Sequence, residues 1–251
     1  MLVFKPVRDL DSVAINVLNK RYFWPGESSW MDITKRVIEN ISREEGFEKE
    51  LLYQLIGNRY FIPNSPTLVN AGKPGGGLSA CFVVPFEDSI EEIYLTKLAF
   101  ALIAKKGGGC GTTLSKIRPK GSPVAGSTHG YAGGPVDFYD TICHDMEVIT
   151  QAGFREMAMM GTMSVYHPDI LYFINAKRQE GKMRTTNISV VVDDEFMRKV
   201  ENDEEYETHF NGKVYAKYKA RDVFNMIVDG AWRNGEPGIL FYERMNNSPY
   251  K

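Results

Sequence analysis

The chain has 251 residues, of which 43% are hydrophobic and 25% are charged, as in an ordinary globular protein. A net charge of −2 provides no overall basic character for wrapping nucleic acid, and no apolar run reaches the roughly 18 residues of a membrane-spanning helix. The first residues, MLVFKPVRDLDS, lack the apolar core of a signal peptide. We therefore expect a cytoplasmic protein with neither nucleic acid nor membrane as a partner.

The chain has three cysteines, Cys81, Cys110 and Cys143, and their odd number and wide spacing argue against a secreted disulfide framework. No CxxC occurs, and the four histidines lack the spacing of zinc ligands. We predict that the chain holds no metal.

Residues 9–57 carry apolar side chains at helical spacing, interrupted by Pro25-Gly26, with Ser28 or Ser29 as the cap of the second helix. We expect an N-terminal helical region over residues 1–60. From Phe61 the sequence becomes rich in glycine, proline and asparagine, which favour turns. Residues 61–251 are predicted to form a second, α/β domain.

Strands and helices alternate from about residue 78 to the end. The pattern predicts strands over 78–86, near 112–117, over 186–194 and over 235–245, helices over 88–106, 135–153, 167–181, 195–202 and 220–234, and a hairpin over 206–219 turning at Asn211-Gly212. Such alternation is typical of parallel βα units, whose functional loops follow the carboxyl ends of the strands.

Cys81 stands after the small residues Leu78-Ser79-Ala80 at the start of an apolar run. A free cysteine is often only a small buried hydrophobe. The alternative is a redox thiol facing a substrate, which needs a second thiol with its Cα within roughly 7 Å. Cys110 and Cys143 are both available, and the pattern singles out neither.

Two glycine-rich segments are candidate ligand-binding sites. Residues 107–111, GGGCG, follow a helix and precede a strand, the reverse of a dinucleotide-binding motif, so they form either a tight turn or a place where the backbone approaches a ligand. In residues 116–134, Arg118 and Lys120 among glycines and hydroxyls suit a phosphate cradle, or else a flexible surface loop.

Seven stretches occur together in the order of one family. They are PNSPTLVNAG (63–72), LSACFVVPFEDSIEEI (78–93), GGGCG to SKIRPKGSPV (107–124), GGPVDFYD (133–140), MG to HPDILYFINAK (160–177), NISVVVDDEFM (187–197) and GEPGILFYERMN (235–246). The chain resembles the large subunit of ribonucleotide reductases, most closely the adenosylcobalamin-dependent class II type.

The resemblance implies a fold, namely a ten-stranded α/β barrel made of two five-stranded parallel half-barrels. It identifies this chain with the N-terminal helical region and the first half-barrel. The family's Asn-Pro-Cys-Gly-Glu-like loop, which carries the radical cysteine and a general-base glutamate, would follow Lys251. We therefore expect a complementary C-terminal half to be needed for activity.

The resemblance also implies a substrate site. Cys81 matches the cysteine that gives reducing equivalents to the ribose 2′ position and ends as half of a disulfide. Ser65, Ala80, Cys81 and Gly109 would contact the ribonucleotide, partly through main-chain groups. Arg155, in the loop over 151–161, would reach the substrate. The residues that follow it, Glu156 and Met157, depart from the small residues usual in the family.

Asp88, Ser89, Ile90 and Arg118 would form an allosteric specificity site for dNTP or ATP effectors, embraced by the loop over 119–130. The helix over 89–105 would form a homodimer interface. The radical would come from adenosylcobalamin or, alternatively, from a metal-containing small subunit, and a thiol reductant such as thioredoxin would renew the cysteines. The competing interpretation is a non-catalytic nucleotide-binding or dimerisation module, or an inactive truncated fragment.

Overall fold

The computed structural model describes residues 5, 7–42, 49–124, 126, 128–151, 157–179 and 181–249. The chain divides into two compact units, residues 1–80 and residues 81–251, which we call the helical unit and the barrel unit. Each is described by itself.

The helical unit contains α1 (Ser12–Arg21), α2 (Trp30–Ile41), α3 (Lys49–Gly57) and α4 (Ser65–Asn70). Of the two predicted caps, Ser29 begins α2: its side chain accepts from the Asp32 amide while the Asp32 carboxylate accepts from the Ser29 amide. The apolar side of α2, with Ile33, Val37 and Ile38 fully buried, forms the centre of this unit's core.

Residues 61–80, which the sequence analysis placed with the barrel, lie in the helical unit. Leu68 and Ala71 belong to the helical unit's buried cluster. Arg36 of α2 holds this segment, because its guanidinium donates to the Leu68 and Ala71 carbonyls at 3.0 and 3.1 Å while pairing with Glu27 at 2.6 Å. One buried cation therefore joins α2 to the end of α4.

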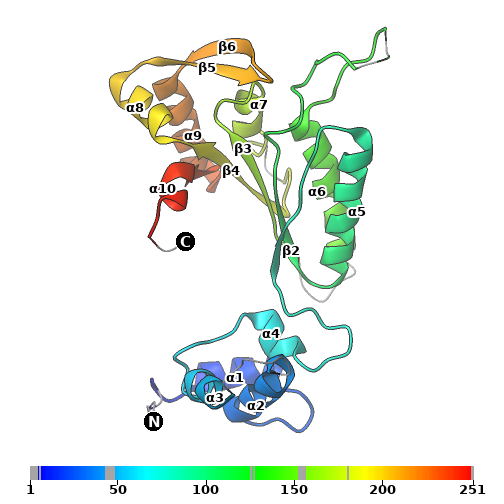
Figure 1. The fold of residues 1–251 in the computed structure, drawn as a ribbon, viewed down its shortest axis with the longest axis vertical. Helices are drawn as coiled ribbons and strands as arrows, with labels where there is room; N and C mark the ends of the chain where they lie inside the picture. Colours follow the sequence, from blue (N-terminus) through cyan, green and yellow to red (C-terminus); the bar gives the residue numbers. More distant parts are fainter. Residues whose placement is uncertain are drawn as a thin grey trace. The chain divides into compact units, whose positions relative to one another are not determined.

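The barrel unit is larger (Figure 1). Its elements are β1 (Cys81–Val83), α5 (Ile90–Lys105), β2 (Gly109–Thr113), α6 (Pro135–Gln151), β3 (Met159–Ser164), α7 (Ile170–Ile174), β4 (Thr186–Val192), α8 (Asp194–Asn202), β5 (Glu205–Phe210), β6 (Lys213–Lys219), α9 (Ala220–Asn234), β7 (Gly238–Phe241) and α10 (Tyr242–Asn246).

Within the described residues, five strands form one sheet in the order β1-β2-β3-β4-β7, and every neighbouring pair is parallel. Right-handed crossovers between strands that follow in chain order place all connecting helices on the same face of a sheet. Figure 1 shows α5 and α6 packed side by side beside the sheet. The predicted five-stranded parallel half of the barrel is confirmed.

Burial alternates along β2 and β3, as a sheet covered on one face requires. In β3, Met159, Gly161 and Met163 are buried while the residues between them are half-exposed. The buried set joins side chains of α5 to α9 in a single core. Over Gly161 lies the ring of Tyr139, whose hydroxyl hydrogen-bonds the Thr186 hydroxyl at 2.6 Å.

The other sheet face, which we call the open face, is built largely from small and hydroxylated residues. The strand register places on it Cys81, Val83, Gly109, Gly111, Thr113, Met160, Thr162, Ser164, Asn187, Ser189, Val191, Gly238 and Leu240. The helices α5 to α9 cover the opposite face of the sheet. Among the described residues, no helix covers the open face in the same way.

Five elements differ from the prediction. The strand expected over 78–86 is β1 alone, and the strand expected over 235–245 is β7, after which residues 242–246 form α10. The methionine-rich segment forms β3, a strand that the pattern did not indicate. Of the helix expected over 167–181, only α7 forms. Pro168 lies in the turn before it, and further turns follow Ile174. The strand expected over 112–117 lies at 109–113, so the glycines of GGGCG enter the sheet. The hairpin turns at Asn211-Gly212, as predicted, with positive φ at both residues.

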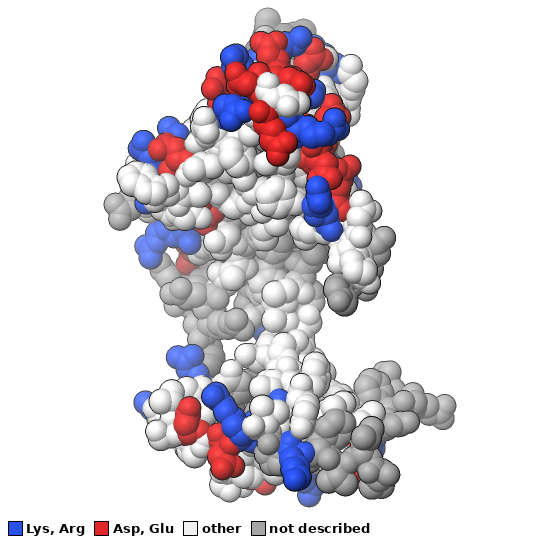
Figure 2. Space-filling model, turned by 90° about the vertical axis from the view of Figure 1, so that its left-hand side faces the viewer, with Lys and Arg blue, Asp and Glu red and all other residues white. Residues whose placement is uncertain are grey.

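The surface of the barrel unit is mixed in charge. Figure 2 shows acidic and basic side chains intermixed at the top of the view. Ion pairs of this kind join β6 and α9 to their surroundings, as in Lys219 and Arg221 with Asp203. In the part of the chain described, no helix is long and apolar enough to cross a membrane.

The packing over Gly161 generates a stability prediction. A Cβ at position 161 would lie 2.6 Å from the buried Tyr139 ring, whereas one at Gly111 on the open face would meet nothing nearer than 3.8 Å. Gly161→Ala should therefore lower the free energy of unfolding by about 1–3 kcal/mol. Gly111→Ala, the matched control, should leave it unchanged or raise it. Urea denaturation measures both, and equal effects would contradict the face assignment.

Candidate active site

Cys81 is the first residue of β1 and its Cα is paired in register with Gly109 of β2. The thiol is exposed, and the register places it on the open face. Because Gly109 has no side chain, the sheet beside the sulfur is bare backbone. The sequence analysis expected functional loops at the carboxyl ends of the strands, but Cys81 lies at the opposite edge, where β1 begins.

The other two cysteines lie in the core. Cys110 is 3% exposed and, being one residue on from Gly109, faces the helix-covered side of the sheet. Burial, with a smaller contribution from Cys81, raises the pKa of the Cys110 thiol to about 11. Cys143 of α6 is 1% exposed, and burial raises its thiol pKa further. Neither residue is placed to pair with Cys81 across the open face.

Asp88 and Arg118 come together after β1 and β2. The Arg118 Nε lies 3.0 and 2.9 Å from the two Asp88 carboxylate oxygens, and the Arg118 amide donates to Asp88 Oδ1 at 3.1 Å. Both side chains are about one-third exposed. The predicted effector residues therefore form one half-exposed, charge-assisted pair at the edge where the strands end.

Ser89 and Ile90 begin α5 beside this pair. The Ser89 hydroxyl accepts from the Glu92 amide at 3.2 Å, so it caps the helix. One side of α5 packs into the core through Ile93 and Phe100. Its other side exposes a stripe of large apolar side chains, namely Ile90, Tyr94, Leu95, Leu98 and Leu102.

The loop between β2 and α6 is held at its base by Lys120. Its Nζ pairs with Asp137 at 2.7 Å, and Tyr172 donates to the same carboxylate at 2.6 Å. These contacts raise the pKa of Lys120. Gly134 packs so closely on the Lys120 backbone that a Cβ there would come within 2.8 Å. Lys120 therefore ties the loop to the start of α6.

Two of the remaining predicted residues belong to the helical unit, and one is not described. Ser65, the first residue of α4, and Ala80 belong to the helical unit, where the Ser65 hydroxyl accepts from Tyr22 at 3.1 Å. Arg155 lies outside the described residues.

Sequence analysis missed a buried ion pair where β4 and β7 begin. Lys177 and Glu236 meet at 3.1 Å with 14% and 9% of their side chains exposed. The Glu236 carboxylate also accepts from the Ile188 amide at 2.7 Å and from the Asn187 side chain at 2.8 Å, fixing that amide on the open face. The signal available in the sequence was Glu236 itself, which stands in the short turn segment Gly-Glu-Pro-Gly at residues 235–238.

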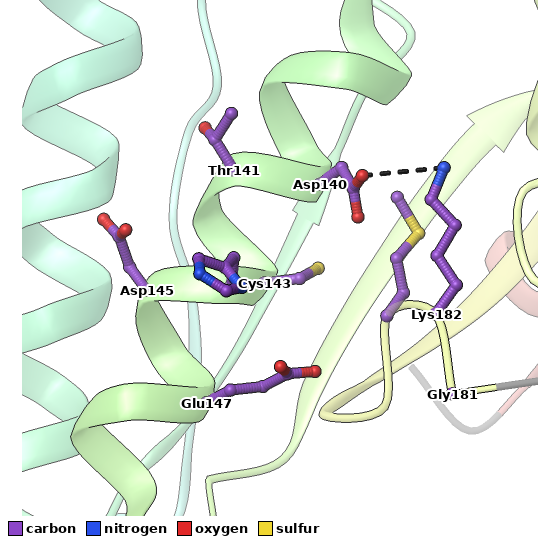
Figure 3. A pocket seen from close by; sticks show the side chains of 9 residues that line it. Asp140, Thr141, Cys143, Asp145, Glu147, Gly181 and Lys182 are labelled. Atoms are coloured by element: carbon purple, nitrogen blue, oxygen red, sulfur yellow. Dashed lines mark ion pairs between the residues drawn. The ribbon is translucent and has the colours of Figure 1, made fainter.

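Two cavities accompany these residues. The first, of about 450 Å³, lies between α6 and the Gly181–Met183 turn, with Asp140 and Lys182 paired across it at 3.6 Å (Figure 3). The second, of about 400 Å³, lies at the carboxyl edge of the sheet and includes Glu87, the neighbour of Asp88. Among the described residues, no cluster of three or more histidine, cysteine or acidic side chains could hold a metal ion.

Comparison with known proteins places this geometry in a family. The profile described as the ribonucleotide reductase all-alpha domain matches residues 8–76, and that of the ribonucleotide reductase barrel domain matches residues 79–250. The chain belongs to the ribonucleotide reductase large-subunit family. The predicted resemblance is confirmed.

Relatives of this reductase chain include vitamin B12-dependent enzymes. It is 45% identical over 190 residues to the vitamin B12-dependent ribonucleoside-diphosphate reductase of Thermoplasma acidophilum, covering 74% of this chain and 24% of the relative. The enzyme of the same name from Mycobacterium tuberculosis is 35% identical over 96% of this chain and 38% of its own length. The chain thus spans between a quarter and two-fifths of these relatives.

The fold agrees with a solved reductase. The Actinobacillus ureae class Id ribonucleotide reductase alpha subunit superposes with a TM-score of 0.70 at 20% identity, over 94% of this chain and 41% of that one.

The contrast between the reductase chain's three thiols is testable. At pH 8, a thiol reagent such as 5,5′-dithiobis(2-nitrobenzoate) should label one sulfur rapidly, and the other two only on unfolding, because burial hides them and keeps them protonated. Cys81→Ser should remove the rapid phase, and Cys110→Ala should retain it. A rapid phase of more than one thiol in the folded wild type would contradict the assignment.

Proposed function

We propose that this chain provides the first half-barrel, one redox thiol and the effector site of a ribonucleotide reductase. The observation that carries the proposal is the position of Cys81, an exposed thiol in register with Gly109 on the open face of a reductase half-barrel. A ribose laid against this bare backbone would meet the sulfur without steric hindrance.

The proposed chemistry is reduction at the ribose 2′ carbon. A thiyl radical on the complementary polypeptide abstracts the 3′ hydrogen, and the 2′ hydroxyl leaves as water with a proton from a thiol. Two thiols supply two electrons and two protons in all as they close a disulfide, and the abstracted hydrogen returns to the 3′ carbon, which regenerates the thiyl radical. Cys81 is one of these thiols. Since Cys110 and Cys143 are buried in the core, the second comes from outside this chain.

A complementary half-barrel is supported by the unpaired parts of the sheet. In the described residues, β1 and β7 each pair with a single neighbouring strand. Parallel sheets are normally covered on both faces, and exposed strand edges invite pairing. A second set of strands would complete the ten-stranded barrel and cover the open face.

The Asp88–Arg118 pair is proposed as the core of a dNTP specificity site. Arg118 offers guanidinium donors to a phosphate or sugar oxygen, and Asp88 offers a carboxylate to a hydroxyl. Ser89 and Ile90 would flank the ligand at the start of α5, and the loop 119–130 would cover it.

The apolar stripe on α5 is proposed as a homodimer surface. Its members recur at helical spacing, with Tyr94, Leu98 and Leu102 each more than half exposed. Two such helices would pack against each other in a symmetric interface.

Adenosylcobalamin is the proposed radical source, because relatives of this chain are named as vitamin B12-dependent reductases. When bound, it supplies the initiating radical, and a metal-containing small subunit is the alternative source. The glycines of the open face leave room beside Cys81, so the residues present are compatible with a large cofactor near the substrate. A thiol reductant such as thioredoxin would reopen the disulfide.

Reconstitution tests the reductase proposal. The chain is combined with a C-terminal reductase polypeptide, and ribonucleotide reduction is measured with adenosylcobalamin and a dithiol. Cys81→Ser should lower turnover by about 10³-fold or more while dNTP binding persists, because only the electron donor is lost. Sustained multiple turnover by that variant would refute the role of Cys81. Binding of dNTP without reduction in any pairing would favour a non-catalytic nucleotide-binding module.

A second experiment separates the effector site from the substrate site. Asp88→Ala should weaken dNTP binding about tenfold, since it leaves Arg118 without its carboxylate partner, and should change ribonucleotide binding by less than about twofold. Glu87→Ala is the matched control, because this adjacent carboxylate makes an exposed pair with Lys116. Equilibrium dialysis measures both ligands, and equal losses would argue against a separate site.

A further inference from the structure

The peptide between Ile117 and Arg118 is held from both sides. Its N–H, that of Arg118, donates to Asp88 at 3.1 Å. Its carbonyl, that of Ile117, lies 2.9 Å from Nε2 of His167, in the segment between β3 and α7. One peptide unit therefore connects the ends of β1, β2 and β3, three neighbouring strands of the sheet.

The hydrogen bonds of His167 fix its tautomer. The Asp169 amide, which can only donate, lies 3.0 Å from Nδ1, so Nδ1 is an acceptor without a proton. Nε2 then carries the proton and donates to the Ile117 carbonyl. The ring is 2% exposed and lies edge-on to Phe210, with centroids 5.7 Å apart. Burial lowers the pKa of His167, which favours this neutral form.

Asp169 makes the second contact to the same loop. Its carboxylate accepts from the Lys120 amide at 2.8 Å and does not cap α7, which it precedes. The segment 167–169 thus binds one backbone group on each side of Arg118, the Ile117 carbonyl and the Lys120 amide.

We propose that His167 and Asp169 are positioning residues that set the dNTP affinity of the effector site by holding the backbone on either side of Arg118. The inference rests on the proposed function of the Asp88–Arg118 pair. His167 acts only as the neutral tautomer, since a proton on Nδ1 would face the Asp169 N–H and break the turn.

Acid should therefore weaken dNTP binding through His167. An ordinary histidine titrates near 6.5, and the pKa of His167 is lowered, so the loss develops below that pH. The charged and titratable groups around the ring are Asp169 in its own segment, Glu87 and Lys116 after β1 and β2, and Tyr166 and His209 around the second cavity. Of these, His209 is the only other histidine and needs a control.

The test compares His167→Gln with His167→Leu. The glutamine carboxamide donates and accepts like the neutral imidazole but does not titrate, whereas leucine leaves the buried Ile117 carbonyl unsatisfied. All four dNTPs are titrated into the chain by calorimetry from pH 8 to pH 5, and the tightest-binding one is used throughout. Exposed His209→Asn is the control, with far-ultraviolet circular dichroism as the check of folding.

We expect His167→Leu to weaken dNTP binding about tenfold at pH 7.5 and His167→Gln to stay within about threefold of wild type. The loss of affinity in acid, beyond that due to the nucleotide's own ionisation, should vanish in His167→Gln and persist in His209→Asn. Asp169→Ala should also weaken dNTP binding. If His167→Leu does not fold, the affinity of Asp169→Ala and the acid dependence of His167→Gln together test the positioning role.

Wild-type affinity in His167→Leu, or an unchanged acid loss in His167→Gln, would overturn the positioning role while leaving the effector site in place. Absence of dNTP binding by the wild-type chain would instead remove the effector site itself, and the positioning role with it.

Discussion

Parallel pairing of the strands in chain order is the constraint on which the barrel unit depends. Since each strand lies beside the one that precedes it in the sheet, every right-handed crossover returns its helix to the same face. That face carries the core of the barrel unit, and the other carries mostly small and hydroxylated residues with one thiol. The chemistry of the open face is thus a consequence of connectivity, not of any single residue.

The two edges of the sheet carry different sets of polar residues. Cys81 and the buried Lys177–Glu236 pair lie where strands begin, and Asp88 and Arg118 lie where strands end. β1 joins the two, because Cys81 and Asp88, whose carboxylate we propose for the effector site, are seven residues apart on one segment. A change in the loop around Arg118 therefore has a short covalent route, through Asp88 and β1, to the sulfur.

Much of this could be predicted from the sequence. The helices from Ile90 and from Ala220 have clear caps or apolar periodicity, and Asn211-Gly212 signals its hairpin. β3 could not be predicted, because methionine favours a helix over a strand, and the identity of this strand comes from its pairing with β2 and β4. Strand pairing is a tertiary interaction that a local pattern does not contain.

The residues of the candidate site could likewise be predicted only in part. Asp88 and Arg118 could be paired only through the resemblance, and the structure joins them directly. His167 gave no signal, since a lone histidine before a proline is equally consistent with a surface turn. Its partners, the Ile117 carbonyl and the Asp169 amide, are backbone groups, which no sequence motif encodes.

The placement of Cys110 on the face opposite Cys81 also bears on damage by oxidants. Peroxide attacks exposed sulfur first and converts it to a sulfenic acid, which a neighbouring thiol normally traps before further oxidation. The core cysteines of this chain are on the wrong side of the sheet to do so. Rescue of an oxidised Cys81 before it reaches the irreversible sulfinic state therefore falls to a thiol other than Cys110 and Cys143.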